Sequence, residues 1–227
     1  MARRKYNVDI KGIEKRKEQY KNSKKIFMIA CEGIATEPKY LKNMLNVLKR
    51  NKSIGVGSDI IFAKHEHSNP TGVLNDLTTD SRYSPYYNCW IVIDRDDEEN
   101  FGKGTGGTSE QEFNSALQKA DKEGVKVAFS NPCFELWVVL HFNYRETAVS
   151  RKEIQQTALE LLRQHNFLTN NDKIKSMKTL DNLYECLLPY LDTAMKNAKT
   201  LDKKNGITKE NPCTHIYKLI EEVSLFN

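Results

Sequence analysis

The stretch Asn88-Cys-Trp-Ile-Val-Ile-Asp94 decides the fold of this chain. An uninterrupted apolar run that ends in an acid is typical of a strand buried on both faces, as in a parallel sheet. Three other segments have a similar apolar character, residues 25–31, 59–64 and 125–129. We therefore predict a mostly parallel sheet of about four strands.

Helical patterns separate these strands. We predict helices over residues 36–50, 70–80, 109–123 and 131–142. Thr36 or Glu37 is the expected cap of the first, and Asn131 that of the last. Strands alternating with helices are typical of an α/β fold with right-handed crossovers. After residue 149 only helices are expected, over 150–164, 179–199 and 214–224. The predicted organisation is a basic arm (1–24), an α/β core (25–148) and a helical extension (149–227) packed on that core.

Composition excludes several protein classes. With 39% hydrophobic and 29% charged residues in 227, the chain is neither collagen-like, nor a coiled coil, nor disordered throughout. No apolar run approaches the ~18 residues of a membrane span, and the basic first residues lead into no apolar segment of a secretory signal. The five cysteines are scattered without a C-x-x-C pair. This distribution indicates a reducing cytoplasm and excludes a zinc finger.

The positive charge is concentrated at the N-terminus. Residues 1–25 carry ten Lys or Arg and three acids, a balance of +7, whereas the remaining 202 residues sum to −2. A basic arm on a nearly neutral body is typical of chains that bind polyanions. The alternative is a solvated tail, and composition alone leaves both open. The candidate nucleic-acid contacts are Arg3, Arg4, Lys5, Lys15, Arg16 and Lys17.

Acidic residues follow the clearest strand. Asp94 and Asp96 are two positions apart, so in extended backbone their carboxylates point to one side, and Asp97 adds a third negative charge. The carboxyl ends of parallel strands are where open α/β sheets build their sites. A hard divalent cation relieves the mutual repulsion of such acids, and Mg²⁺ suits one or two carboxylates. An acidic turn without function is the alternative interpretation.

A second acid ends the first strand. Cys31-Glu32-Gly33 places one carboxylate at the same predicted edge, and the glycine permits a sharp turn. An all-oxygen set without cysteine favours Mg²⁺ or Mn²⁺ over zinc. Glu32, Asp94, Asp96 and Asp97 are therefore the predicted metal ligands.

Two levels of resemblance follow from these motifs. Glu32-Gly33 together with Asp94-x-Asp96 resembles the Toprim superfamily of topoisomerases, primases and nucleases. Longer strings resemble one branch of it, the RloB-like family of bacterial phage-defence proteins. The matching strings are CEGIATEPKYL (31–41), VIDRDD (92–97), SNPCFELW (130–137) with His141-Phe142, and NPCT (211–214).

The resemblance implies a metal-dependent nuclease or nuclease-like effector, often encoded beside an ABC-type ATPase. In Toprim sites the glutamate is the general acid/base and the D-x-D pair binds Mg²⁺. Carried over to this chain, these roles fall on Glu32 and on Asp94 with Asp96.

Glu135 lies in a predicted helix that is apolar on nearly every face. A buried carboxylate without a partner is costly, so a partner is expected. With Asn131 as the cap and Pro132 first, Glu135 would be the fourth helical residue, one position past a capping box. The helix follows a strand directly and starts at the acidic edge. We therefore predict that Glu135 is a catalytic residue that completes the site as a metal or water ligand.

Other motifs carry less specific signals. His65-x-His67 has the spacing of two metal ligands, although two loop histidines are the commoner interpretation. The glycines of residues 102–107 fail the phosphate-loop pattern, and a lid over the acids fits them better. No nucleophile motif is present.

The leading hypothesis from the sequence is a Mg²⁺-dependent phosphodiesterase acting on nucleic acid in phage defence, with RNA such as tRNA favoured slightly over DNA. The competing hypothesis is a non-catalytic Toprim-like module that binds nucleic acid or an ATPase partner. A homodimer is left open.

Overall fold

A computed structural model describes residues 26–53, 58–95, 110–206 and 209–224. Its centre is a five-stranded sheet in the order β2-β1-β3-β4-β5. The strands are β1 (Ile26–Cys31), β2 (Asp59–Phe62), β3 (Asn88–Asp94), β4 (Lys126–Asn131) and β5 (Cys213–Thr214). The first four are parallel, whereas β5 is antiparallel to β4. The predicted α/β class with a mostly parallel sheet is confirmed.

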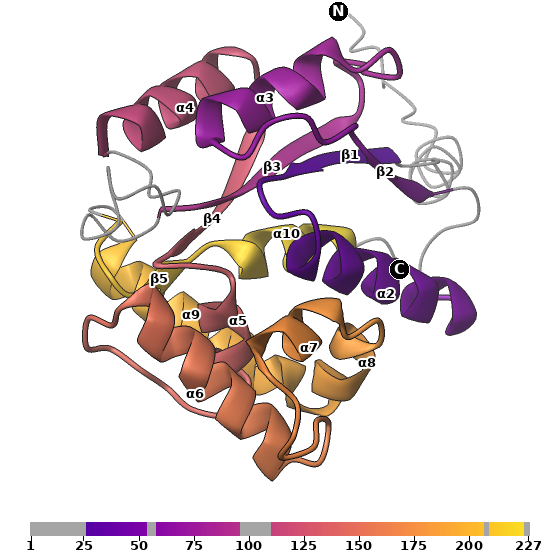
Figure 1. Cartoon of the computed structure of the whole chain (residues 1–227). Helices are drawn as coiled ribbons and strands as arrows, with labels where there is room; N and C mark the ends of the chain where they lie inside the picture. The colour runs from indigo at the N-terminus through magenta and orange to yellow at the C-terminus, as the bar shows by residue number, and fades with distance from the viewer. Residues whose placement is uncertain (1–25, 54–57, 96–109, 207–208, 225–227) are drawn as a thin grey trace, which may run out of the picture.

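Helices cover both faces of the sheet (Figure 1). Helices α3 (Pro70–Thr79) and α4 (Glu110–Lys122) lie on one face, and α2 (Thr36–Arg50), α5 (Glu135–Leu140) and α10 (Ile216–Ser224) lie on the other. Side chains alternate accordingly. Met28 and Ile91 belong to the core under α3 and α4, whereas Ile29 and Val92 belong to the opposite core. Each central strand is therefore buried on both faces of the sheet, which explains its continuous apolar sequence.

The remaining helices pack against α2 and α5 (Figure 1). They are α6 (Arg151–Gln164), α7 (Ile174–Thr179), α8 (Leu183–Leu187), the 3-10 turn η2 (Leu188–Tyr190) and α9 (Leu191–Asn205). Their apolar faces join the core on the α2 side. This core is one cluster of contacting residues, whose members range from Phe27 to Val223 in the sequence. The C-terminal helices and the sheet thus share one hydrophobic core.

Three local predictions were wrong. Asn131 does not cap a helix; it is the last residue of β4, paired with Cys213, and α5 begins only at Glu135. The predicted helix 179–199 is divided into α8, η2 and α9, because Pro189 has no N–H to donate at that point. The last predicted helix begins at Ile216, because Thr214 pairs with Ser130 in the sheet.

Among the described residues, every helix is too short or too polar to cross a lipid bilayer.

Candidate functional site

Three of the predicted acids lie at the carboxyl edge of the sheet. Glu32 follows β1, Asp94 ends β3, and Glu135 begins the helix after β4. These three strands are neighbours, in the order β1-β3-β4. Asp94 and Glu135 are buried, and Glu32 is half-buried. The sheet topology therefore gathers carboxylates from segments about one hundred residues apart.

Glu32 and Asp94 are joined directly. The backbone N–H of Asp94 donates to Oε2 of Glu32 over 3.0 Å, and the backbone N–H of Glu32 donates to the carbonyl of Val92 over 2.9 Å. Burial raises the pKa of Glu32 to about 7, and the nearby charge of Glu37 adds to this effect. Burial also raises the pKa of Asp94 well above its ordinary range. Both carboxyls are thus poised to exchange protons or to accept a cation.

Glu37 is a further member of the site, although the sequence predicts for it only the role of a helix cap. Glu37 is 6% exposed, and the cap position of α2 is occupied by Ala35. Burial raises the pKa of Glu37 to about 7, and Glu135 contributes to the rise. The signal in the sequence was weak, because an acid in a first helical turn is usually a favourable dipole partner.

Gly33 leaves space for the side chain of Glu37. A Cβ atom added to Gly33 would collide with the carboxylate of Glu37. The glycine after Glu32 therefore does more than permit a turn, because it leaves space in which a second carboxylate lies against the backbone.

Glu135 occupies the first position of α5 and is 3% exposed. The thiol of Cys133 hydrogen-bonds to its carboxylate. Its negative charge raises the pKa values of Glu37 and Asp94, which shows that it faces the same space. The helix position predicted from the sequence was wrong, but the structure brings Glu135 to the edge where Glu32 and Asp94 lie.

Arg151 brings a positive charge to the acids. It is the first residue of α6, and its Nη2 lies 3.4 Å from Oδ2 of Asp94. Its charge lowers the pKa values of Glu32, Glu37 and Asp94, but burial outweighs it at all three. Nothing in the sequence marked this residue, because its position depends on how the C-terminal helices pack.

The carboxylates of this edge do not converge on one point. Among the described residues, no three acids of this edge bring oxygen atoms within 4.8 Å of one another. Asp96 and Asp97 lie outside the described residues, as do Arg3, Arg4, Lys5, Lys15, Arg16, Lys17 and the glycine-rich stretch 102–107. The donor set is nevertheless chemically suited to Mg²⁺ or Mn²⁺, since carboxylate oxygens are hard ligands.

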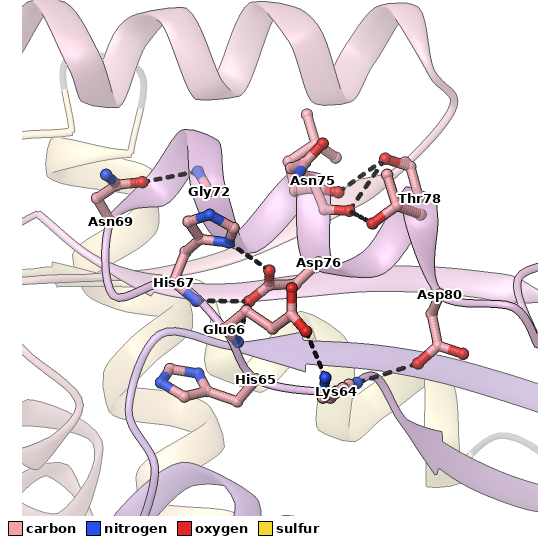
Figure 2. Close-up of polar contacts among 12 residues, drawn as sticks. Lys64, His65, Glu66, His67, Asn69, Gly72, Asn75, Asp76, Thr78 and Asp80 are labelled. Atoms are coloured by element: carbon pink, nitrogen blue, oxygen red, sulfur yellow. Dashed lines mark hydrogen bonds and ion pairs between the residues drawn. The ribbon is translucent and has the colours of Figure 1, made fainter.

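The two histidines after β2 do not form a metal pair (Figure 2). The Nδ1 atom of His67 lies 2.5 Å from Oδ1 of Asp76, whereas Nδ1 of His65 lies 3.2 Å from the carbonyl of Cys31. Asp76 also accepts the backbone N–H groups of Glu66 and His67. Although burial opposes it, these hydrogen bonds hold the pKa of Asp76 below its usual value. Asp76 thus fixes the segment that places His65 beside β1.

Comparison with known proteins identifies one family. No curated protein and no solved structure matches the chain. The family model described as RloB-like protein matches residues 27–223, which include the described strands and helices except for the end residues Ile26 and Ser224. Every acid described above lies within that match. The chain belongs to the RloB-like family.

Proposed function

We propose that this protein is a Mg²⁺-dependent or Mn²⁺-dependent nuclease that acts on nucleic acid in bacterial phage defence. The observation that carries the proposal is the group of three buried carboxylates, Glu37, Asp94 and Glu135, together with the half-buried carboxylate of Glu32. Burial without sufficient positive charge raises the pKa values of three of them, and Arg151 compensates only in part. A divalent cation would stabilise these negative charges. Membership of the RloB-like family is consistent with the proposed function.

The proposed ligands are Asp94, Asp96 and Glu32, with Glu37, Glu135 and Asp97 as additional oxygen donors. A bound ion would polarise the phosphate and lower the pKa of a water molecule. Glu32 is suited to move the proton, since its pKa of about 7 allows both protonation states near neutral pH. Its orientation is held by the backbone N–H of Asp94. Arg151 is suited to attract the phosphate, because its guanidinium lies 3.4 Å from the carboxylate of Asp94.

Partners follow from the sequence and from the family. We propose that the basic arm, with Arg3, Arg4, Lys5, Lys15, Arg16 and Lys17, binds the phosphate backbone of the substrate, for which RNA is favoured slightly over DNA. An ABC-type ATPase is the proposed regulatory partner.

The decisive experiment incubates purified protein with mixed RNA and DNA in Mg²⁺, Mn²⁺ or EDTA. Cleavage is expected with either metal and not with EDTA. Asp94→Asn should abolish it, whereas Asp121→Asn, a matched change at an exposed position of α4, should not. Cleavage that persists in Asp94→Asn would contradict the proposal.

A melting experiment tests metal binding separately. Mg²⁺ or Mn²⁺ should raise the melting temperature of the native chain, because the ion binds the folded state preferentially. The double variant Asp94→Asn, Asp96→Asn should remain folded and lose that rise. Binding of nucleic acid without cleavage or a metal response would favour the non-catalytic module instead.

A further inference from the structure

A second cluster of potential ligands lies away from the acidic edge. Asp202 of α9, Cys213 of β5 and His215 bring a carboxylate oxygen, a thiol sulfur and a ring nitrogen within 4.8 Å of one another. Cys213 and His215 are two positions apart, so they point to the same side of the chain. Thr214 between them points the other way, where its hydroxyl contacts Ser130 at 2.9 Å. The cluster therefore faces away from that hydroxyl pair.

The ligand positions are held by other parts of the fold. The backbone N–H of His215 donates to the carbonyl of Phe129 over 2.7 Å, and the two rings pack with centroids 4.2 Å apart. The hydroxyl of Tyr217 donates to Oδ2 of Asp202 over 2.6 Å. Cys213 is completely buried and pairs with Asn131 in the sheet. Each ligand is thus oriented by a contact that does not involve the other two.

The hydrogen bonds within the cluster conflict with one another. Nε2 of His215 lies 2.6 Å from Oδ1 of Asp202 and 3.0 Å from Nζ of Lys218. A single ring nitrogen cannot both donate a proton to the carboxylate and accept one from the ammonium. The ammonium also lies 3.1 Å from Oδ2 of Asp202. Lys218 therefore pairs with Asp202, but its ammonium faces a ring nitrogen that cannot accept from it while donating to the carboxylate.

We propose that Asp202, Cys213 and His215 form a transition-metal site for Zn²⁺, with Lys218 as the cation that the metal displaces. Mixed sulfur, nitrogen and oxygen ligands suit Zn²⁺ and do not suit Mg²⁺. One carboxylate, one thiolate and a neutral imidazole balance the charge of a divalent ion. His215 and Lys218 also line a surface groove of about 510 Å³, which gives an ion a path from solvent.

Metal binding requires the thiol to lose its proton. Burial raises the pKa of Cys213 to about 12, with a contribution from the charge of Asp202. Ligation removes this proton to solvent, since the metal binds the thiolate. Burial also lowers the pKa of His215, and the charge of Lys218 acts in the same direction. The site does not depend on the acids at the sheet edge.

The test uses the reduced, full-length protein titrated with Co²⁺, a spectroscopic substitute for Zn²⁺. One equivalent should produce a near-ultraviolet thiolate-to-cobalt charge-transfer band and visible bands of tetrahedral strength. Zn²⁺ should erase these bands, whereas excess Mg²⁺ should not. Cys213→Ser should abolish the charge-transfer band. Cys133→Ser is the matched control, because Cys133 is equally buried but lies beside Glu135, and this variant should retain the band.

A second variant keeps the proposal testable if Cys213→Ser fails to fold. Lys218→Met removes the competing ammonium, so the affinity for Co²⁺ should rise by at least about tenfold, as expected for a unit charge close to a divalent ion in water. Lys199→Met is its control, since Lys199 pairs with Glu221 instead. The absence of a charge-transfer band in the native protein, the same band in Cys213→Ser, or an unchanged affinity in Lys218→Met would overturn the proposal.

Discussion

Gly33 and Glu37 show how one missing side chain shapes the candidate site. The carboxylate of Glu37 occupies space that a Cβ on Gly33 would need. Gly33→Ala should therefore move this flexible side chain while costing less than about 1 kcal/mol in the free energy of unfolding. Cleavage should fall by about 10²-fold, as for a misplaced group. In a Glu37→Ala background the same change should have no further effect, and a full additional loss there would separate Gly33 from Glu37.

A substitution of Glu135 can distinguish a catalytic role of this residue from a purely structural one. Glu135→Gln keeps the volume and the hydrogen bond to Cys133 but removes the charge that faces Glu37 and Asp94. We expect weaker Mn²⁺ binding and cleavage reduced by at least ~10²-fold. Glu160→Gln on the exposed side of α6 is the control. Full activity with unaltered Mn²⁺ affinity in Glu135→Gln would leave the residue a structural role only.

At the scale of elements, one buried hydrogen bond joins the two helices that carry Glu37 and Glu135. The indole Nε1 of Trp137 in α5 donates to the hydroxyl of Tyr40 in α2 over 2.8 Å. Tyr40→Phe leaves this N–H buried without an acceptor, so the free energy of unfolding should fall by about 1–3 kcal/mol in denaturant titration. Tyr184→Phe is the control. It deletes the hydroxyl of the neighbouring ring, and that hydroxyl makes no hydrogen bond within the described part of the chain. Equal losses in both variants would contradict this role.

The elements also explain what the sequence could predict. Residues 88–94 predict a buried strand because burial on both faces requires apolar side chains throughout. The two-residue β5 has no such signal, since its pairing with Ser130 and Asn131 depends on the position of the chain after the end of α9. The same pairing extends β4 to Asn131 and delays α5 to Glu135. Strand ends near Glu32 and Asp94 were therefore predictable, whereas Glu37 and Arg151 depended on helix packing.

For the whole molecule, the buried acids set a characteristic pH dependence. Glu32 and Glu37 have pKa values of about 7 when folded against 4.5 ordinarily, so between these values the unfolded chain binds fewer protons than the folded one. The free energy of unfolding of the metal-free protein should therefore fall as pH rises from 4.5 to 7, by at most about 3 kcal/mol per carboxyl. His141 opposes this trend, because burial lowers its pKa to about 4.

Comparison with Glu37→Gln isolates the acids from His141. The variant should lose part of the fall, and Mg²⁺ should stabilise the native protein more at pH 8 than at pH 5. Thermal melts across this range measure both effects. Identical pH profiles for the two proteins would show that Glu37 does not titrate as described.

The basic arm is predicted to act on the molecule as a whole. Deleting residues 1–22 removes eight Lys or Arg and three acids. Affinity for nucleic acid should fall and depend less steeply on salt, because fewer counterions are released on binding. Melting of the core should change little. An unchanged salt slope in binding titrations would assign the arm to a protein partner or to no binding role.

The continuous core from Phe27 to Val223 has a consequence for biosynthesis. Strand β1 is translated well before α9 and α10, whose apolar residues join the same core on the α2 side. Arg151 likewise emerges more than one hundred residues after Glu32. A nascent chain consequently cannot assemble the group around Asp94 until Arg151 has been translated, and it cannot close this core until α10 has been translated. In a protein proposed to cut nucleic acid, this order would keep unfinished chains harmless while they are still attached to the translation machinery.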